Sequence, residues 1–249
     1  MRLPVVKGLI ERRVLVNFRV RADVLQRLVP APFRVLTVGG WGMAGVCLIR
    51  LAHERPRFLP SFLGFGSENA AHRIAVEWDA ASGPVKGVYV HRRDTSSALN
   101  AFVGGRYFPG KHHRATFTVT ETERDYAIAL RSTDGATHIA VRGRVASALP
   151  PTSVFADVAV ASAFFEQGAI GCSATDDPHC FDCLELRSFG WHVEPLAVER
   201  VESSWFEDTV RFPAGSVEFD SALLMRDVAH EWWSHEALQT PGDSERSAG

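Results

Sequence analysis

This sequence has few cysteines and lacks a long hydrophobic run, and each of these features excludes a class of protein. Four cysteines in 249 residues are too few for the disulfide scaffold of a small secreted domain, so we expect four free thiols. No apolar run approaches the ~20 residues that a membrane helix needs, and residues 1–8 lack the architecture of a signal peptide. These absences predict a cytoplasmic protein with no membrane partner.

An excess of charge of either sign is also absent. The formal net charge is −2, which gives no basis for nucleic acid as a partner. The sequence has no phosphate-binding loop, no dinucleotide fingerprint and no G-x-S-x-G nucleophile elbow, so we expect no cofactor. Hydrophobic residues make up 46%, enough for a sizeable core. A small molecule is therefore the expected partner, and the sequence leaves open whether the chain forms a homo-oligomer.

The cysteine and histidine pairs do not have the spacing of a metal site. Cys180 and Cys183 resemble half of a zinc site, but four ligands are needed and no second close cysteine pair exists. His230 and His235 are five residues apart, whereas a helical zinc pair is four apart. We therefore expect no bound metal.

Alternation of apolar and polar residues at a period of two predicts most of the secondary structure. Strands are expected at about 14–20, 33–38, 41–51, 68–78, 87–90, 112–121, 126–132, 137–146, 169–174, 184–187, 191–206 and 217–225. Helical spacing and capping residues predict helices at about 23–29, 95–107 and 153–167. The segment 55–66 is either an ordered loop over a cavity or a plain surface loop. We expect one domain over residues 1–239 and a disordered tail over 240–249.

A cationic cluster lies between the second predicted helix and the strand that follows it. Its members are Arg106, Lys111, His112, His113 and Arg114. Strand alternation puts Lys111 and His113 on one face and His112 and Arg114 on the other. A strand–helix–strand unit with such a turn at its exit is typical of one wall of a small-molecule site.

Two segments resemble the acetoacetate decarboxylase superfamily. Residues 23–32, Asp-Val-Leu-Gln-Arg-Leu-Val-Pro-Ala-Pro, look like its early helix, and the helix, Gly-Arg pair, proline turn and lysine of residues 95–111 are similar to the region around its catalytic lysine. The chain looks most like an uncharacterised bacterial branch, a domain of unknown function, over residues 10–230. The resemblance implies a β-rich α+β fold: a strongly bent antiparallel sheet or cone-like β-barrel with a few helices.

The resemblance implies that Lys111 is a catalytic amine. A lysine that forms a Schiff base must lose its proton, which burial or nearby cations favour. Lys111 lies about two residues nearer to Gly105-Arg106 than the family pattern requires, and the family carries two consecutive lysines where this chain has Lys111-His112. The residues alone equally allow a solvated lysine on a turn.

Glu68 falls near the active-site glutamate of the superfamily, so a catalytic role in orienting substrate or moving protons is expected; the alternative is a surface glutamate at a strand end. Arg12 and Arg13 lie where the superfamily places an arginine that holds a substrate carboxylate, although arginines on the surface of an edge strand also fit. The residues expected to bind substrate are Arg106, His113, Asn69 and Arg13. The cavity should lie inside the curved sheet, between Glu68, aromatic residues of 55–65 and part of 106–113.

Two functions follow. The first is a lyase of the decarboxylase type, acting on a keto or hydroxy acid through an amine. The second is a small-molecule-binding protein that keeps the pocket without the lysine chemistry. A zinc-dependent or redox protein using the cysteines ranks third.

Overall fold

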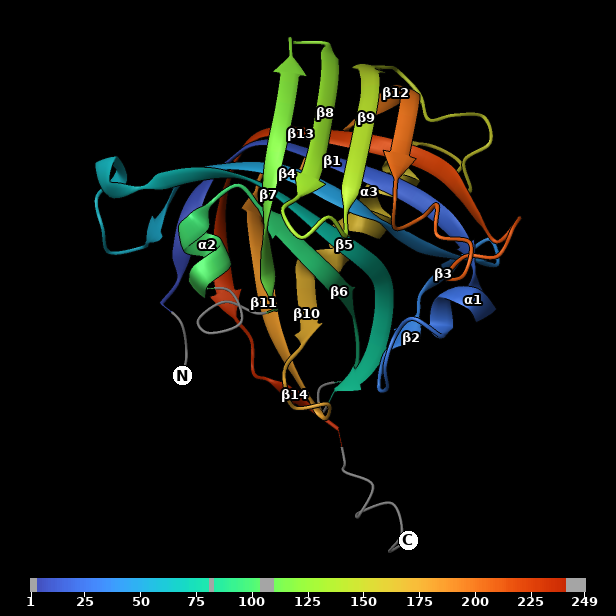
Figure 1. The fold of residues 1–249 in the computed structure, drawn as a ribbon, viewed down its shortest axis with the longest axis horizontal. Helices are drawn as coiled ribbons and strands as arrows, with labels where there is room; N and C mark the ends of the chain where they lie inside the picture. Colours follow the sequence, from blue (N-terminus) through green and yellow to red (C-terminus); the bar gives the residue numbers. More distant parts are fainter. Residues whose placement is uncertain (1–3, 81–82, 104–109, 241–249) are drawn as a thin grey trace, which may run out of the picture.

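One large bent sheet runs through the part of the chain that this computed structural model describes, residues 4–80, 83–103 and 110–240 (Figure 1). The strands are β1 Val6–Arg21, β2 Arg34–Val35, β3 Thr37–Val38, β4 Trp41–Pro56, β5 Phe65–Ala80, β6 Gly83–Thr95, β7 His112–Glu121, β8 Asp125–Ser132, β9 His138–Val145, β10 Ile170–Ala174, β11 Cys180–Phe189, β12 Glu194–Ser203, β13 Val217–Ser234 and β14 Leu238–Gln239. The helices are α1 Ala22–Gln26, α2 Ala98–Val103 and α3 Val158–Glu166, with short 3₁₀ turns η1 Ser61–Leu63 and η2 Gln167–Ala169. The β-rich α+β prediction is confirmed.

Four long strands, β13, β1, β4 and β5, form the central wall of the molecule. They pair antiparallel with one another, and both faces of the wall are covered. Val14, Val16 and Leu48 pack into one hydrophobic core, while Leu15 and Ile49 pack into a second core on the opposite face. A strand buried on both faces is apolar at consecutive positions instead of alternate ones, which explains the unbroken apolar runs in β1 and β4.

Two further groups of strands leave the wall on its opposite faces. The sheet order is β14-β11-β10-β6-β7-β8-β9-β12-β13-β1-β4-β5-β2, and the extra pairings β11–β13 and β6–β5 fold the sheet back on itself. In Figure 1, β7, β8, β9 and β12 extend upward from the wall, whereas β10 and β11 lie below. The side with β10 and β11 holds the cavity described below.

The main strands form the bent antiparallel sheet that the sequence predicts, and two parallel pairings make the sheet as a whole mixed. Strand β6 runs parallel to both β7 and β10. The connection from β6 to β7 passes through α2, and the chain reaches β10 through α3. A crossover of this kind returns the chain in the same direction, whereas a tight hairpin reverses it.

The prediction of four free thiols is wrong, because Cys172 and Cys183 form a disulfide. These residues are direct partners across the antiparallel pair β10–β11, and such cross-strand neighbours are close enough to be bridged. Cys180, three residues from Cys183, lies on the same strand and stays free, as does Cys47. In the described part of the chain, no group of three or more potential ligand residues could hold a metal ion.

The helices are shorter than the sequence predicts. Asp157 caps α3 by accepting a hydrogen bond from the Val160 backbone N–H at 2.8 Å, while the Ser153 hydroxyl donates to Asp220 instead. Only 98–103 of the expected helix 95–107 is described as helical; residues 104–107, like 241–249 of the expected tail, lie outside the described residues. The segment 55–66 closes the β4–β5 hairpin with largely exposed side chains. No helix among the described residues is long and apolar enough to cross a membrane.

Candidate functional site: a cavity lined by unpaired arginines

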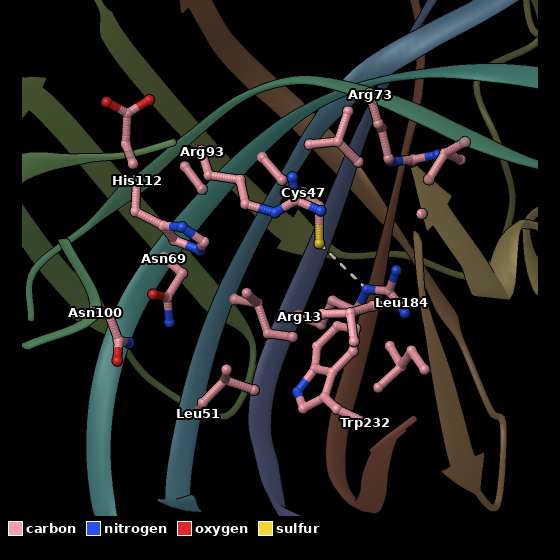
Figure 2. A pocket seen from close by; sticks show the side chains of 18 of the residues that line it. Arg13, Cys47, Leu51, Asn69, Arg73, Arg93, Asn100, His112, Leu184 and Trp232 are labelled. Atoms are coloured by element: carbon pink, nitrogen blue, oxygen red, sulfur yellow. Dashed lines mark hydrogen bonds between the residues drawn. The ribbon is translucent and has the colours of Figure 1, made fainter. Parts of the chain in front are cut away.

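A cavity of about 180 Å³ lies between the central wall and strands β6, β10 and β11 (Figure 2). Side chains from the hydrophobic residues of several strands form most of its surface. The polar residues that line it are Arg13, Cys47, Glu54, Asn69, Arg73, Arg93, Asp94, Asn100 and His112. The apolar residues include Ile49, Leu51, Val88, Val90, Leu184, Leu186 and Trp232. The cavity is therefore apolar, with a few polar groups that converge on it, as small-molecule sites generally are.

Strand alternation decides which wall residues reach the cavity. On β4 and β5 most of the residues that line the cavity are odd-numbered, among them Cys47, Asn69 and Arg73, while Glu54 and Ala70 are even-numbered exceptions. The even-numbered neighbours, such as Val46 and Ile74, pack into the core on the other face. The side chains of one strand thus serve two separate interiors.

A β-bulge at His91 turns Arg93 toward the cavity. Arg73 of β5 pairs with Val90 of β6, but His72 pairs with Arg92, so His91 is an extra residue between the two pairs. Val88 and Val90 line the cavity, and without the bulge Arg92 would follow them on the same face. With the bulge Arg93 takes that place.

Arg73 carries a buried positive charge without an acidic partner. The side chain is 6% exposed. Its Nη2 donates to the Asn17 side-chain oxygen at 2.6 Å, its guanidinium lies 5.0 Å from the centre of the Phe165 ring, and its Nε has no hydrogen-bond partner. Among the described residues, no carboxylate lies within ion-pair distance of it. Burial lowers the pKa of Arg73 to about 10, which leaves the group charged at neutral pH.

Arg93 and His112 form a second polar group in the cavity. Arg93 donates to the Ser173 hydroxyl, and burial lowers its pKa to about 10. Burial, together with the charge of Arg93, lowers the pKa of His112 to about 4, so the imidazole is neutral at pH 7. The His112 Nδ1 lies 3.1 Å from the Gly110 carbonyl oxygen, which can only accept. The proton therefore resides on Nδ1, and Nε2 is left as an acceptor.

Arg13 and Cys47 meet on neighbouring wall strands. The Arg13 Nε–H donates to the Cys47 sulfur at 3.2 Å, and the guanidinium lies 5.8 Å from the centre of the Trp191 ring. Strand β1 pairs with β13 on one side and β4 on the other, so the reading of Arg12 and Arg13 as surface residues of an edge strand is wrong.

Glu68 and Arg12 lie on the wall face opposite to the cavity. Arg12 bonds to both Glu68 and Glu121, and so does Arg50, with 2.6 Å between Arg12 Nη1 and Glu121 Oε2 and between Arg50 Nε and Glu68 Oε1. We call these four residues the closed ion network. Glu68 does not line the cavity, because its carboxylate is directed to Arg12 and Arg50, whereas the next residue, Asn69, does line it.

The remaining predicted site residues divide between the cavity and the surface. Lys111 is 76% exposed, and its Nζ lies 3.0 Å from Asp176. His113 pairs with Asp134 at 3.0 Å between Nδ1 and Oδ2. Arg13 and Asn69 line the cavity, whereas Arg106 lies outside the described residues.

Among the cavity residues, sequence reasoning missed Cys47, Arg73 and Arg93, whereas His112 belongs to the segment 106–113 that was expected to contribute to the cavity. A signal existed for Arg73, because an arginine in the middle of an apolar strand is unusual and buried charges need a reason. No local signal marked Arg93, since simple alternation from Val88 and Val90 selects Arg92 instead.

The described residues thus form a β-rich fold around an apolar cavity that carries unpaired guanidinium groups. No protein-family profile and no curated protein matches the sequence. Solved structures do match. Acetoacetate decarboxylase from Legionella pneumophila aligns with a TM-score of 0.61 and 9% identity over 96% of this chain and 88% of its own. An acetoacetate decarboxylase-like enzyme from Sphingomonas wittichii gives 0.56 and 11% over 96% and 93%.

A third solved structure is that of the enduracididine biosynthesis enzyme MppR in complex with pyruvate. It aligns with a TM-score of 0.55 and 9% identity over 94% of this chain and 89% of its own. These alignments span nearly the whole of both chains, so the chain has the acetoacetate decarboxylase-like fold.

Proposed function

We propose that this protein binds a compact 2-oxo or 2-hydroxy carboxylic acid in the cavity, and that it does so without forming an imine. The observation that carries the proposal is the buried charge of Arg73, which has no carboxylate partner among the described residues. Burying an unpaired charge is costly. A ligand carboxylate that accepts from this guanidinium offsets that cost and forms a charge-assisted hydrogen bond.

The rest of the cavity supports a small ligand with a second polar group. A volume of about 180 Å³ lies below the ~300–1,000 Å³ that drug-sized ligands occupy. The neutral His112 offers an acceptor for a hydroxyl, while Arg93 offers donors for a carbonyl oxygen. Ile49, Leu51 and other apolar side chains suit a short hydrocarbon tail. Pyruvate, which accompanies MppR, belongs to this chemical class.

The positions of the lysines support binding without an imine. The chain has three lysines, at positions 7, 86 and 111, and all lie in the described residues. None of them lines the cavity. Lys86 donates to the Gln167 side chain at 2.9 Å, and Lys111 is largely exposed beside Asp176. An amine outside the cavity cannot reach the carbonyl carbon of an acid that is bound inside it.

Calorimetric titration with pyruvate, lactate and the uncharged pyruvamide tests the proposal. We expect the two acids to bind, and pyruvamide to bind at least about tenfold more weakly because it lacks the carboxylate. Arg73→Met should weaken pyruvate binding about 10- to 100-fold, the range that a hydrogen bond to a charged group supplies. Equal binding of pyruvate and pyruvamide, or no binding of any compact carboxylate, would contradict the proposal.

A matched control separates the cavity charge from the total charge. Arg142 lies on β9, is 71% exposed and has its nearest carboxylate, Glu199, 4.0 Å away. Arg142→Met makes the same chemical change outside the cavity, and it should leave pyruvate binding unchanged. If both variants weaken binding equally, the long-range charge of the protein, not Arg73, holds the acid.

A further inference from the structure

We propose that Cys47 is a nucleophile in this cavity, whose thiol adds reversibly to the carbonyl carbon of a bound 2-oxo acid. The inference rests on the proposed function, because the guanidinium groups must hold the carboxylate for the thiol to meet the adjacent carbonyl. It deepens that function, since it distinguishes 2-oxo acids, which are captured covalently, from 2-hydroxy acids, which can only bind.

The first observation is the position of Cys47 in the middle of the cavity wall. It lies on β4 between Leu15 of β1 and Ala71 of β5, its register partners. Ala71 also lines the cavity, and its side chain is small. Cys47 itself lines the cavity and is 6% exposed. Figure 2 draws its sulfur among the cavity side chains, joined by a dashed line to Arg13.

The second observation is the cationic surroundings of the sulfur. Arg13 donates its Nε–H to the sulfur at 3.2 Å, so the sulfur acts as an acceptor and can direct its own proton elsewhere. Arg73 is near enough for an electrostatic interaction with Cys47. The guanidinium groups of Arg13 and Arg73 thus lie on the side of the cavity wall that carries the sulfur.

The third observation is independent of the cysteine and points to a ligand. The Arg73 side chain is more than nine-tenths buried, its Nε has no partner, and it lines the same cavity as Cys47. We expect a carboxylate bound by Arg73 to bring the adjacent carbonyl carbon toward the wall that carries Cys47, since both residues line the same cavity. No lysine, serine, threonine or tyrosine lines the cavity among the described residues, which leaves the thiol as the strongest nucleophile available.

The step is a simple addition that needs no further reactant. The sulfur forms a bond to the carbonyl carbon, the carbonyl π electrons move to the oxygen, and the proton lost by the thiol is taken up by that oxygen. The product is a hemithioketal, and reversal releases the unchanged acid. A 2-oxo acid suits this reaction because the neighbouring carboxylate both anchors the molecule and makes the carbonyl carbon electrophilic. Nothing is oxidised or reduced.

Carbon-13 NMR of the full-length protein with pyruvate labelled at the carbonyl carbon tests the step. We expect a protein-bound signal in the tetrahedral-carbon range with the wild-type protein. Cys180→Ala is the matched control, because Cys180 is the other free cysteine and does not line the cavity; it should keep the signal. Cys47→Ala should lose it. The hydrate of free pyruvate gives its own signal, which a sample without protein identifies.

Calorimetry on the same samples separates this inference from the proposed function. If Cys47→Ala still binds pyruvate, within about tenfold of the wild-type affinity, while the bound tetrahedral signal disappears, the inference holds. If the wild type binds pyruvate and gives no bound tetrahedral signal, or Cys47→Ala retains one, the inference is wrong and the proposed function stands. If no acid binds, the proposed function itself fails.

Alkylation gives a second readout that does not depend on pyruvate. Iodoacetate is an acid and iodoacetamide is its uncharged counterpart, so the guanidiniums should concentrate only the first beside Cys47. The ratio of the iodoacetate rate to the iodoacetamide rate should be about tenfold higher at Cys47 than at Cys180, measured by mass spectrometry of the two peptides. Excess pyruvate should slow alkylation of Cys47 alone. Equal ratios at both cysteines, or no modification of Cys47 in the folded protein, would contradict the inference.

Discussion

The arginines on the two faces of the central wall differ in whether they have carboxylate partners. On one face, Arg12 and Arg50 are each bound to both Glu68 and Glu121, so the closed ion network satisfies its own charges. On the other face, Arg13 and the two remaining cavity arginines have no carboxylate partner among the described residues. Arg12 and Arg13 are neighbours in the chain, as are Glu68 and Asn69. A shift of one position along β1 therefore separates an arginine that is paired within the protein from one that is available to a ligand.

The largest expected effect comes from opening the closed ion network. Arg12 is 2% exposed, and Arg12→Met leaves two carboxylates with one cation between them. Removing one partner of a buried ion pair costs about 3–5 kcal/mol, and we expect a loss of that size in the free energy of unfolding. Urea denaturation measures it, with Arg142→Met as control. A loss below ~1 kcal/mol would mean that the network is not structural.

Acid should destabilise both faces through their neutral histidines. Burial lowers the pKa of His72 to about 3 and, with the charge of Arg93, that of His112 to about 4, whereas an unfolded histidine titrates near 6.5. As pH falls from 6.5 toward 4, these histidines become protonated in the unfolded state but stay neutral in the folded state, so the free energy of unfolding decreases. At pH 4.5 each histidine contributes a loss of about 2–3 kcal/mol, since one pKa unit is ~1.4 kcal/mol.

Unfolding of wild type and His72→Phe between pH 7.5 and 4.5 checks this pH dependence. His72 packs near Trp205 on the core face, and neither ring nitrogen has a hydrogen-bond partner. The variant should show a shallower decline with acid than the wild type. Parallel declines in the two proteins would show that His72 takes no part.

A smaller effect on stability is expected when the cavity charge is removed. Arg73→Met relieves an unpaired buried charge but deprives Asn17 of a donor, and the two changes offset each other. We expect the free energy of unfolding to change by no more than ~1 kcal/mol, in contrast to Arg12→Met. Urea denaturation of both variants side by side measures the difference. A loss from Arg73→Met as large as that from Arg12→Met would remove the distinction between the two faces.

The smallest effect is expected at Lys111. Lys111→Arg keeps the positive charge beside Asp176 and should change the free energy of unfolding by less than ~0.5 kcal/mol. Neither the wild type nor the variant should gain mass on treatment with pyruvate or a 3-oxo acid and borohydride, because none of the three lysines, all of which are described, lines the cavity. A Lys111-dependent mass increase would restore the imine mechanism and overturn this part of the proposed function.

The sequence predicts the strands better than it predicts their neighbours. Local alternation was sufficient to expect β5, β8 and β9 near their observed positions, because each strand carries its own apolar pattern. The partners of β6 are set by crossovers far along the chain, so its two parallel pairings had no local signal. The Cys172–Cys183 bridge likewise depends on the pairing of two separate strands.

The site was predictable to within one residue along β1 and β5. That one-residue difference determines whether a side chain faces the cavity or the opposite face of the wall. The pair Arg12-Arg13 and the pair Glu68-Asn69 both drew attention in the sequence, but the choice of face depends on which interior each strand position meets. At Arg93 the bulge reverses the face that alternation selects. Bulges arise from how two strands pair, so the pattern within one strand does not predict them.

The doubly covered wall also has a consequence for how this protein can change over time. On β4 and β5 most cavity residues are odd-numbered and their core neighbours even-numbered, so substitutions at adjacent residues affect different properties, ligand binding in one case and stability in the other. A descendant that takes a new ligand can vary Cys47, Asn69 or Arg73 while its stability is kept by the residues between them. Among future relatives, sequence differences should therefore concentrate at the cavity-lining positions of these strands when the ligand changes, while the core positions between them stay similar and maintain the fold.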